Sequence, residues 1–269
     1  MPADSPNPPP ATQTSSGPTA FDWSDYALCL RRAVRDDGVD YAALLDDPAP
    51  LDRALSRLAR CGPNLSPRFF AKPADRTAYW INAHNAAVLR GVVELIREHR
   101  RRAGPRAMPD RQARDVETSF AFILDGEKLR PADLRRRALD SAGNDWRVRF
   151  ALCDGRVVGP GLQRRPFLGD VLEVQLNDAV RDEMARPGVV RIDHGEQQLV
   201  IWPGLAQLRP MLVAELRRKT GAPNLSFFNV LLDWAAPQRR RLLNRAVGYD
   251  EVLMPDDSRI NHAGRREGM

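Results

Sequence analysis

The residues best suited to nucleophilic chemistry are a cysteine and a histidine that lie far apart in the chain. Cys153 ends the run "WRVRFALC" and precedes a glycine turn, and His84 lies within "AYWINAHNAAVLRGVV". A thiol becomes a useful nucleophile when a nearby imidazole or cation lowers its pKa, and catalytic partners can be distant in sequence. His84 and Cys153 are therefore candidate catalytic groups. Because free cysteine is commonly buried, the sequence favours a packing thiol over a nucleophile for Cys153.

Other familiar kinds of site find little support. The histidines, at positions 84, 99, 194 and 262, have no recognised ligand spacing, and the cysteines, at positions 29, 61 and 153, form no CxxC pair. This pattern argues against a metal site and against a disulfide framework. The chain also has no Walker loop, no GxGxxG fingerprint and no GxSxG elbow, so we expect no cofactor.

The strongest predicted helix begins near Asp75 and carries His84. Ile81, Val88 and Val92 recur on one apolar face, and Asn85 falls on the same face. Asn85 should therefore be buried. A buried amide costs free energy unless its donors and acceptor are matched, so we expect it to bond a neighbouring segment.

The segments around this helix predict both strands and helices. Alternation in "WRVRFALC" predicts a strand with Val148, Phe150 and Leu152 on one face and Arg149 and Cys153 on the other. "FILDGEKL" predicts a strand and a turn, followed by a helix near Pro131, and "VVRIDHGEQQLVIW" predicts a hairpin that turns at His194 and Gly195. Helical spacing returns in most of the later segments.

These elements predict a predominantly helical α+β domain with a small sheet or hairpin. The expected organisation is a disordered Pro/Ser/Thr-rich tail over residues 1–20, one domain over 21–261 and a flexible tail over 262–269. The amino end has neither the basic start nor the apolar core of a signal peptide, and no apolar run is long enough for a membrane span. We therefore expect a cytoplasmic protein.

The formal net charge is +6, and an arginine-rich stretch, "REHRRRAGPRAMPDRQAR", contains Arg100, Arg101, Arg102 and Arg106. Nucleic acid is nevertheless a poor candidate partner. No aromatic residue interleaves with these arginines to stack on bases, and no helix-turn-helix, zinc-finger or RRM signature accompanies them. The expected partner is a protein or a small molecule.

Several segments in order resemble the DUF547 family, whose members are largely uncharacterised. "AYWINAHNAAVLRGVV" resembles the family's I-N-x-Y-N-A helix, with Asn82 and Asn85 in place and His84 replacing the usual tyrosine. "LDGEKLRPADLRRRAL" resembles its S-L-x-D-I-E segment, and "DWRVRFALCDGRVVGPGL" resembles D-P-R-I-H-F-A-L followed by S-C-P-P-L. The ending "MPDDSRIN" echoes Y-D-W-S-L-N and retains Asn261. The resemblance covers residues 21 to 261.

The departures from the family pattern bear most on function. Where the family has a glutamate, a histidine and a cysteine, this chain has Asp133, Arg149 and Val158. Arginine stays protonated and cannot act as a general base, and valine has no nucleophile. The resemblance thus implies a cleft containing Asn82, Asn85, Asp133, Arg149 and Val158 in a noncatalytic binding or interaction module. Asp133 and Arg149 are expected to form an ion pair. The alternative is a hydrolase or transferase with a rearranged site around His84, Cys153 and Asp133.

Overall fold

The computed structural model describes residues 20–263 except 106, 108, 110–112, 144, 256 and 258. Nearly all of the predicted tails, residues 1–20 and 262–269, lies outside this part, as does Arg106. The described chain is mostly helical with three small sheets, which confirms the predicted α+β class. No helix in the described ranges is both long and apolar enough to cross a membrane.

A long central helix organises the amino-terminal half. α4 begins at Pro73, whose fixed φ suits a first helical position, and ends before Gly104, whose φ is 105°. Most of its first six turns is buried. The elements that precede it in the chain are α1 (Ser24–Ala33), β1 (Val34–Arg35), β2 (Gly38–Val39), α2 (Tyr41–Asp46), α3 (Ala49–Arg60), the 3-10 turn η1 (Pro67–Phe69) and α4 (Pro73–Ala103).

A hairpin and three helices follow. The chain turns at Asp125 and Gly126, both with positive φ, so the predicted single strand is one arm of an antiparallel pair. The helix predicted near Pro131 begins at that residue and packs along α4. These elements are α5 (Ala113–Ser119), β3 (Phe122–Leu124), β4 (Glu127–Leu129), α6 (Pro131–Ser141) and α7 (Val148–Ala151).

The strand predicted for "WRVRFALC" is wrong. Residues 148–151 form a single helical turn, and the backbone becomes extended only at Leu152. Val148, Phe150 and Leu152 are buried as the alternation predicts, but so are Ala151 and Cys153. Four consecutive residues, 150–153, are therefore buried, whereas a strand with one exposed face would bury alternate residues.

The carboxy-terminal part has its own small sheet. The predicted hairpin is confirmed: β5 pairs antiparallel with β6, and the turn between them contains His194 and Gly195. β7 then adds to the other edge of β6 in parallel. The elements are η2 (Gly169–Val171), α8 (Leu172–Ala185), β5 (Val190–Asp193), β6 (Gln198–Ile201), α9 (Pro203–Thr220), α10 (Phe227–Trp234), α11 (Pro237–Asn244) and β7 (Asp250–Leu253).

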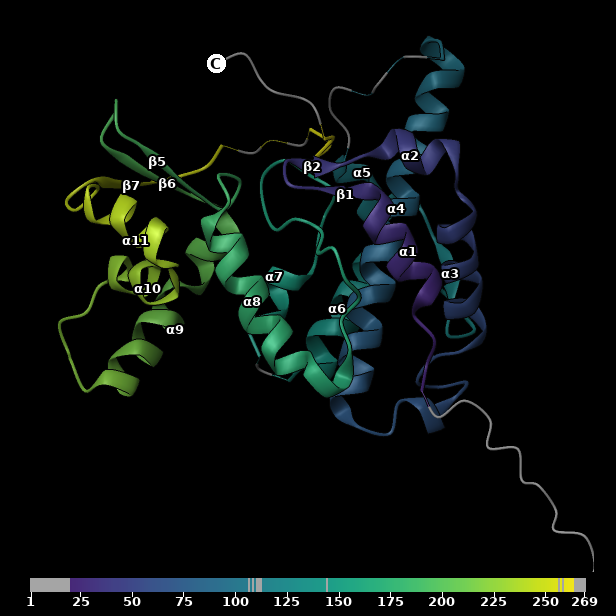
Figure 1. Ribbon diagram of the computed structural model, residues 1–269, viewed down its shortest axis with the longest axis horizontal. Coiled ribbons are helices and arrows are strands. Elements are labelled where there is room, and N and C mark those ends of the chain that lie inside the picture. The colour runs from purple at the N-terminus through teal and green to yellow at the C-terminus, as the bar shows by residue number, and fades with distance from the viewer. Residues whose placement is uncertain are drawn as a thin grey trace, which may run out of the picture.

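Two hydrophobic clusters are joined by shared elements. The first surrounds α4, and the second fills the space among α9, α10, α11 and the three-stranded sheet. Figure 1 shows these groups at opposite ends of the molecule, with α6, α7 and α8 between them. α8 contributes Leu176 to the first cluster and Val180 to the second, and in α7 Ala151 and Phe150 divide in the same way.

Candidate functional site: an arginine pocket

Polar side chains on the buried face of α4, among them Asn82, His84 and Asn85, bond backbone groups of other segments. Asn82 donates to the carbonyl of Phe167 at 2.8 Å and accepts from its N–H at 2.9 Å. Asn85 donates to the carbonyl of Ala151 at 2.9 Å and accepts from the N–H of Cys153 at 3.0 Å. Both amides are almost fully buried, which confirms the burial and bonding predicted for Asn85. These residues position the chain after α7 and do not line either of the pockets described below.

His84 is enclosed between two carbonyl groups. Its Nδ1 lies 3.0 Å from the oxygen of Pro131, and its Nε2 lies 3.0 Å from the oxygen of Cys153. Burial, assisted by the positive charge of Arg135, lowers the pKa of His84 to about 4. The imidazole is therefore neutral near pH 7, and both ring nitrogens face backbone oxygens rather than a thiol.

The thiol of Cys153 occupies an environment that suppresses its reactivity. The residue is buried, and this burial raises the pKa of the thiol to about 12, with the charge of Asp154 acting in the same direction. Its sulfur accepts from the N–H of Gly155 at 3.3 Å and lies 3.8 Å from Nδ2 of Asn261. Asn261 also accepts from the Tyr41 hydroxyl at 2.8 Å. The contacts are those of a packing thiol.

Asp133 lies apart from the other candidates. Its Oδ2 accepts from the backbone N–H of Arg130 at 3.1 Å, and its Oδ1 pairs with Arg136 at 3.2 Å. These bonds close the first turn of α6, where a carboxylate is favoured by the helix dipole. The predicted Asp133–Arg149 pair is therefore wrong, because Asp133 has local partners and Arg149 lies in a pocket that Asp133 does not line.

Arg149 and Val158 do lie together, in a pocket between the two halves of the molecule. We call it the arginine pocket; its volume is about 690 Å³, within the range typical of small-molecule sites. Its polar lining is Glu117, Thr118, Arg135, Arg149, Asp154, Arg156 and Gln207, and its other lining residues are Leu139, Leu152, Val158, Trp202, Pro203, Gly204 and Pro255.

Two of the three arginines in this pocket have carboxylate partners. Arg135 pairs with Glu117 at 2.7 Å, and Arg156 pairs with Asp154 at 2.6 Å. Burial would raise the pKa of Glu117, but the charge and hydrogen bond of Arg135 outweigh it and hold that pKa below its usual value. Glu117 is therefore ionised at neutral pH.

Arg149 is the exception. Its side chain is exposed in the pocket, and it makes no ion pair or hydrogen bond with any residue that the structure describes. A planar guanidinium with free N–H donors binds carboxylate and phosphate oxygens in two-point contacts. The pocket can therefore receive an anionic group at Arg149.

Trp202 forms a fixed wall of the pocket. Its ring packs edge-to-face against Phe150, with centroids 6.1 Å apart, and lies so close to Gly204 that a Cβ there would come within 2.3 Å of the ring. The absence of a side chain at Gly204 thus lets the indole lie against the start of α9. Trp202 joins the second hydrophobic cluster, whereas Leu152 on another wall belongs to the first.

Sequence reasoning missed most of the lining of this pocket, including Glu117, Arg135, Asp154, Arg156 and Trp202. These five come from α5, α6, the loop after α7 and the residue before α9. The resemblance did point to this helix, but to Asp133 rather than to Arg135, which lies two residues later and lines the pocket.

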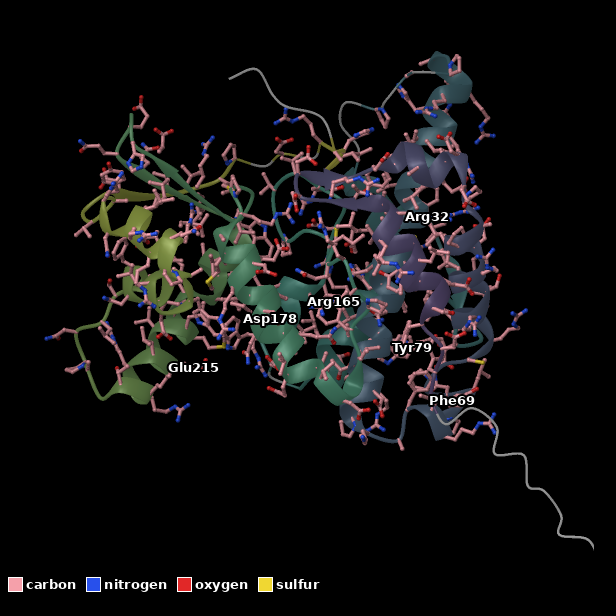
Figure 2. All side chains as sticks on the ribbon, in the orientation of Figure 1. Arg32, Phe69, Tyr79, Arg165, Asp178 and Glu215 are labelled. Carbon is pink, nitrogen blue, oxygen red and sulfur yellow. The ribbon has the colours of Figure 1, made fainter. Side chains whose placement is uncertain are left out.

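A second large pocket has mixed charge. Arg165 and Asp178, labelled in Figure 2, line it together with Asp182, Glu183 and Asn261. Burial raises the pKa of Asp182, and the nearby Asp178 acts in the same direction. Among the residues that the structure describes, no group of three or more His, Cys, Asp or Glu side chains has an arrangement suited to a metal ion.

The fold and these pockets define a mostly helical α+β protein with an arginine-containing pocket between two hydrophobic clusters. Residues 70–182 match the family model described as "Protein of unknown function, DUF547", so this part of the chain is a DUF547 domain. No curated protein and no solved structure matches the chain. The matched region includes α4 and all the arginines of the pocket, whereas Trp202 and the start of α9 lie beyond it.

Proposed function

We propose that this protein is a noncatalytic binding module that holds an anionic ligand in the arginine pocket. The observation that carries the proposal is the exposed guanidinium of Arg149, which has no carboxylate partner among the described residues although Arg135 and Arg156 beside it do. A cation left uncompensated in a concave site attracts an anion, and the low-dielectric walls strengthen that attraction.

The chemistry of the pocket lining supports binding rather than turnover. Among the residues that the structure describes, no cysteine and no histidine lines the arginine pocket. Val158 and Arg149 occupy the positions where the family resemblance places a cysteine and a histidine. The alternative, a hydrolase or transferase using His84, Cys153 and Asp133, lacks geometric support. His84 contacts the backbone oxygen of Cys153, and Asp133 is engaged at the start of α6.

The test is anion binding measured with simple anions. Acetate, benzoate, phosphate and sulfate would be titrated one at a time at constant ionic strength, with the midpoint of thermal unfolding as the readout. We expect at least one anion to give a saturable rise in the wild type that Arg149→Met abolishes. Arg101→Met, which removes an exposed arginine near the end of α4, is the matched control and should retain the response.

Two results would refute the proposal. The first is the absence of a saturable response to every anion. The second is a response of equal size in the wild type and in Arg149→Met, because the anion would then bind elsewhere.

A further inference from the structure

We infer that the ligand of the arginine pocket is a monocarboxylate with an apolar body, and this inference rests on the proposed function above. The charges of the pocket are the first reason. Glu117 and Asp154 each neutralise one arginine, and Arg149 remains as the one lining cation without a carboxylate partner among the described residues. A single negative charge compensates it.

A dianion fits this arrangement less well. The lining carries three arginines and two acidic residues, so a monoanion balances its formal charge, whereas a phosphate ester dianion leaves one negative charge in excess. A carboxylate leaves no such excess. Its two oxygens also match the parallel N–H donors of a guanidinium.

The remaining walls require an apolar ligand body. Leu139, Leu152, Val158 and two prolines line the pocket together with the indole of Trp202. Apolar surface of this kind is stabilised when a hydrocarbon group displaces water from it. Acetate would fill only a small part of a volume of about 690 Å³, whereas an arylalkanoic or medium-chain aliphatic acid would reach the walls as well as Arg149.

The walls also show which part of the chain should select the ligand. The three arginines lie within the DUF547 match, but Trp202, Pro203 and Pro255 lie beyond residue 182. The DUF547 region thus supplies the contact with the anion, and the carboxy-terminal segment supplies much of the apolar surface that contacts the rest of the ligand.

The experiment compares matched probes by isothermal titration calorimetry. 4-Phenylbutanoate is measured against acetate, which lacks the body, against 4-phenylbutanamide, which lacks the charge, and against phenyl phosphate, which is a dianion. We expect 4-phenylbutanoate to bind roughly tenfold or more tightly than each of the other three, since a charge-assisted hydrogen bond and a buried ring are each typically worth a factor of that order.

Two variants test separately the contact of the carboxylate with Arg149 and the contact of the ligand body with Val158. Arg149→Met should weaken 4-phenylbutanoate about tenfold or more and make its affinity equal to that of the amide. Val158→Thr keeps the shape of the wall but adds a hydroxyl, so it should weaken 4-phenylbutanoate several-fold and leave acetate unchanged. Both side chains are at least partly exposed, so neither change removes a core residue.

The outcomes separate this inference from the proposed function. If phenyl phosphate binds as tightly as 4-phenylbutanoate, or if acetate does, while Arg149→Met abolishes binding, the pocket binds anions but the ligand class is wrong. If 4-phenylbutanoate binds wild type and Arg149→Met equally, both the inference and the proposed function are wrong.

Discussion

At the scale of single residues, His84 shows how burial fixes a protonation state. A neutral imidazole donates through one nitrogen only, yet both ring nitrogens lie 3.0 Å from a carbonyl oxygen. The imidazolium would satisfy both oxygens, but full burial and the neighbouring Arg135 oppose the charge and lower the pKa to about 4. His84 therefore acts as a neutral link between α4, the first residue of α6 and the loop after α7, and the sequence alone did not indicate these partners.

This environment predicts a pH dependence of stability. In the unfolded chain His84 titrates near 6.5, so between about pH 6.5 and pH 4 the unfolded state binds more protons than the folded state. The contribution of His84 is fully present above pH 6.5 and is lost as pH falls toward 4, by roughly 3 kcal/mol over the whole interval. Urea unfolding at a series of pH values should show the free-energy difference between wild type and His84→Gln shrinking across this range. Parallel curves for the two proteins would contradict the assignment.

At the scale of elements, α4 could be predicted and the loop after α7 could not. The 3.6-residue spacing of Ile81, Val88 and Val92 is local, and it placed Asn85 on the buried face without knowledge of its partner. Except for Arg149, residues 148–153 are buried against elements distant in sequence, so their alternation resembled a strand although residues 148–151 form a helical turn. The pairing of Asp133 with Arg149 failed for a related reason, because the bonds at the start of α6 are satisfied locally.

Replacement of Asn85 is expected to destabilise the protein strongly, because its amide bonds two backbone groups of another segment. Asn85→Leu has a similar volume but leaves the carbonyl of Ala151 and the N–H of Cys153 unpaired in a dry environment. The expected loss is about 2–4 kcal/mol in the free energy of unfolding, measured by chemical denaturation. As a control, Asn64→Ala removes an amide whose bond to Glu127 is exposed, and its cost should stay within about 0.5 kcal/mol. Equal costs for the two variants would contradict the positioning role of Asn85.

At the scale of the whole molecule, the site is a product of tertiary structure. The lining of the arginine pocket extends from Glu117 to Pro255, and its two sides belong to different hydrophobic clusters. The sequence pattern reached Arg149 and Val158 through family resemblance, but no local period indicates that Trp202 faces them. The class of fold was predictable because helices are encoded locally, whereas the pocket depends on how those helices pack.

The shared elements predict that the two clusters unfold together. α7 and α8 place side chains in both clusters, so loss of one cluster exposes apolar surface of the other. We expect one domain over residues 21–261 and therefore a single cooperative transition. Hydrogen exchange followed by mass spectrometry at rising denaturant should show amides of α4 and α9 becoming exposed with the same midpoint. Separate midpoints would instead indicate two domains.

The central claim is that Arg149 receives an anionic ligand in the arginine pocket. The most direct measurement is a crystal of the protein soaked with 4-bromobenzoate, whose bromine can be located by anomalous scattering. We expect a bromine peak among Val158, Trp202 and the neighbouring prolines, with the carboxylate in two-point contact with the guanidinium of Arg149. An empty arginine pocket at a concentration that saturates binding in solution, or bromine only at the pocket lined by Arg165, would contradict it.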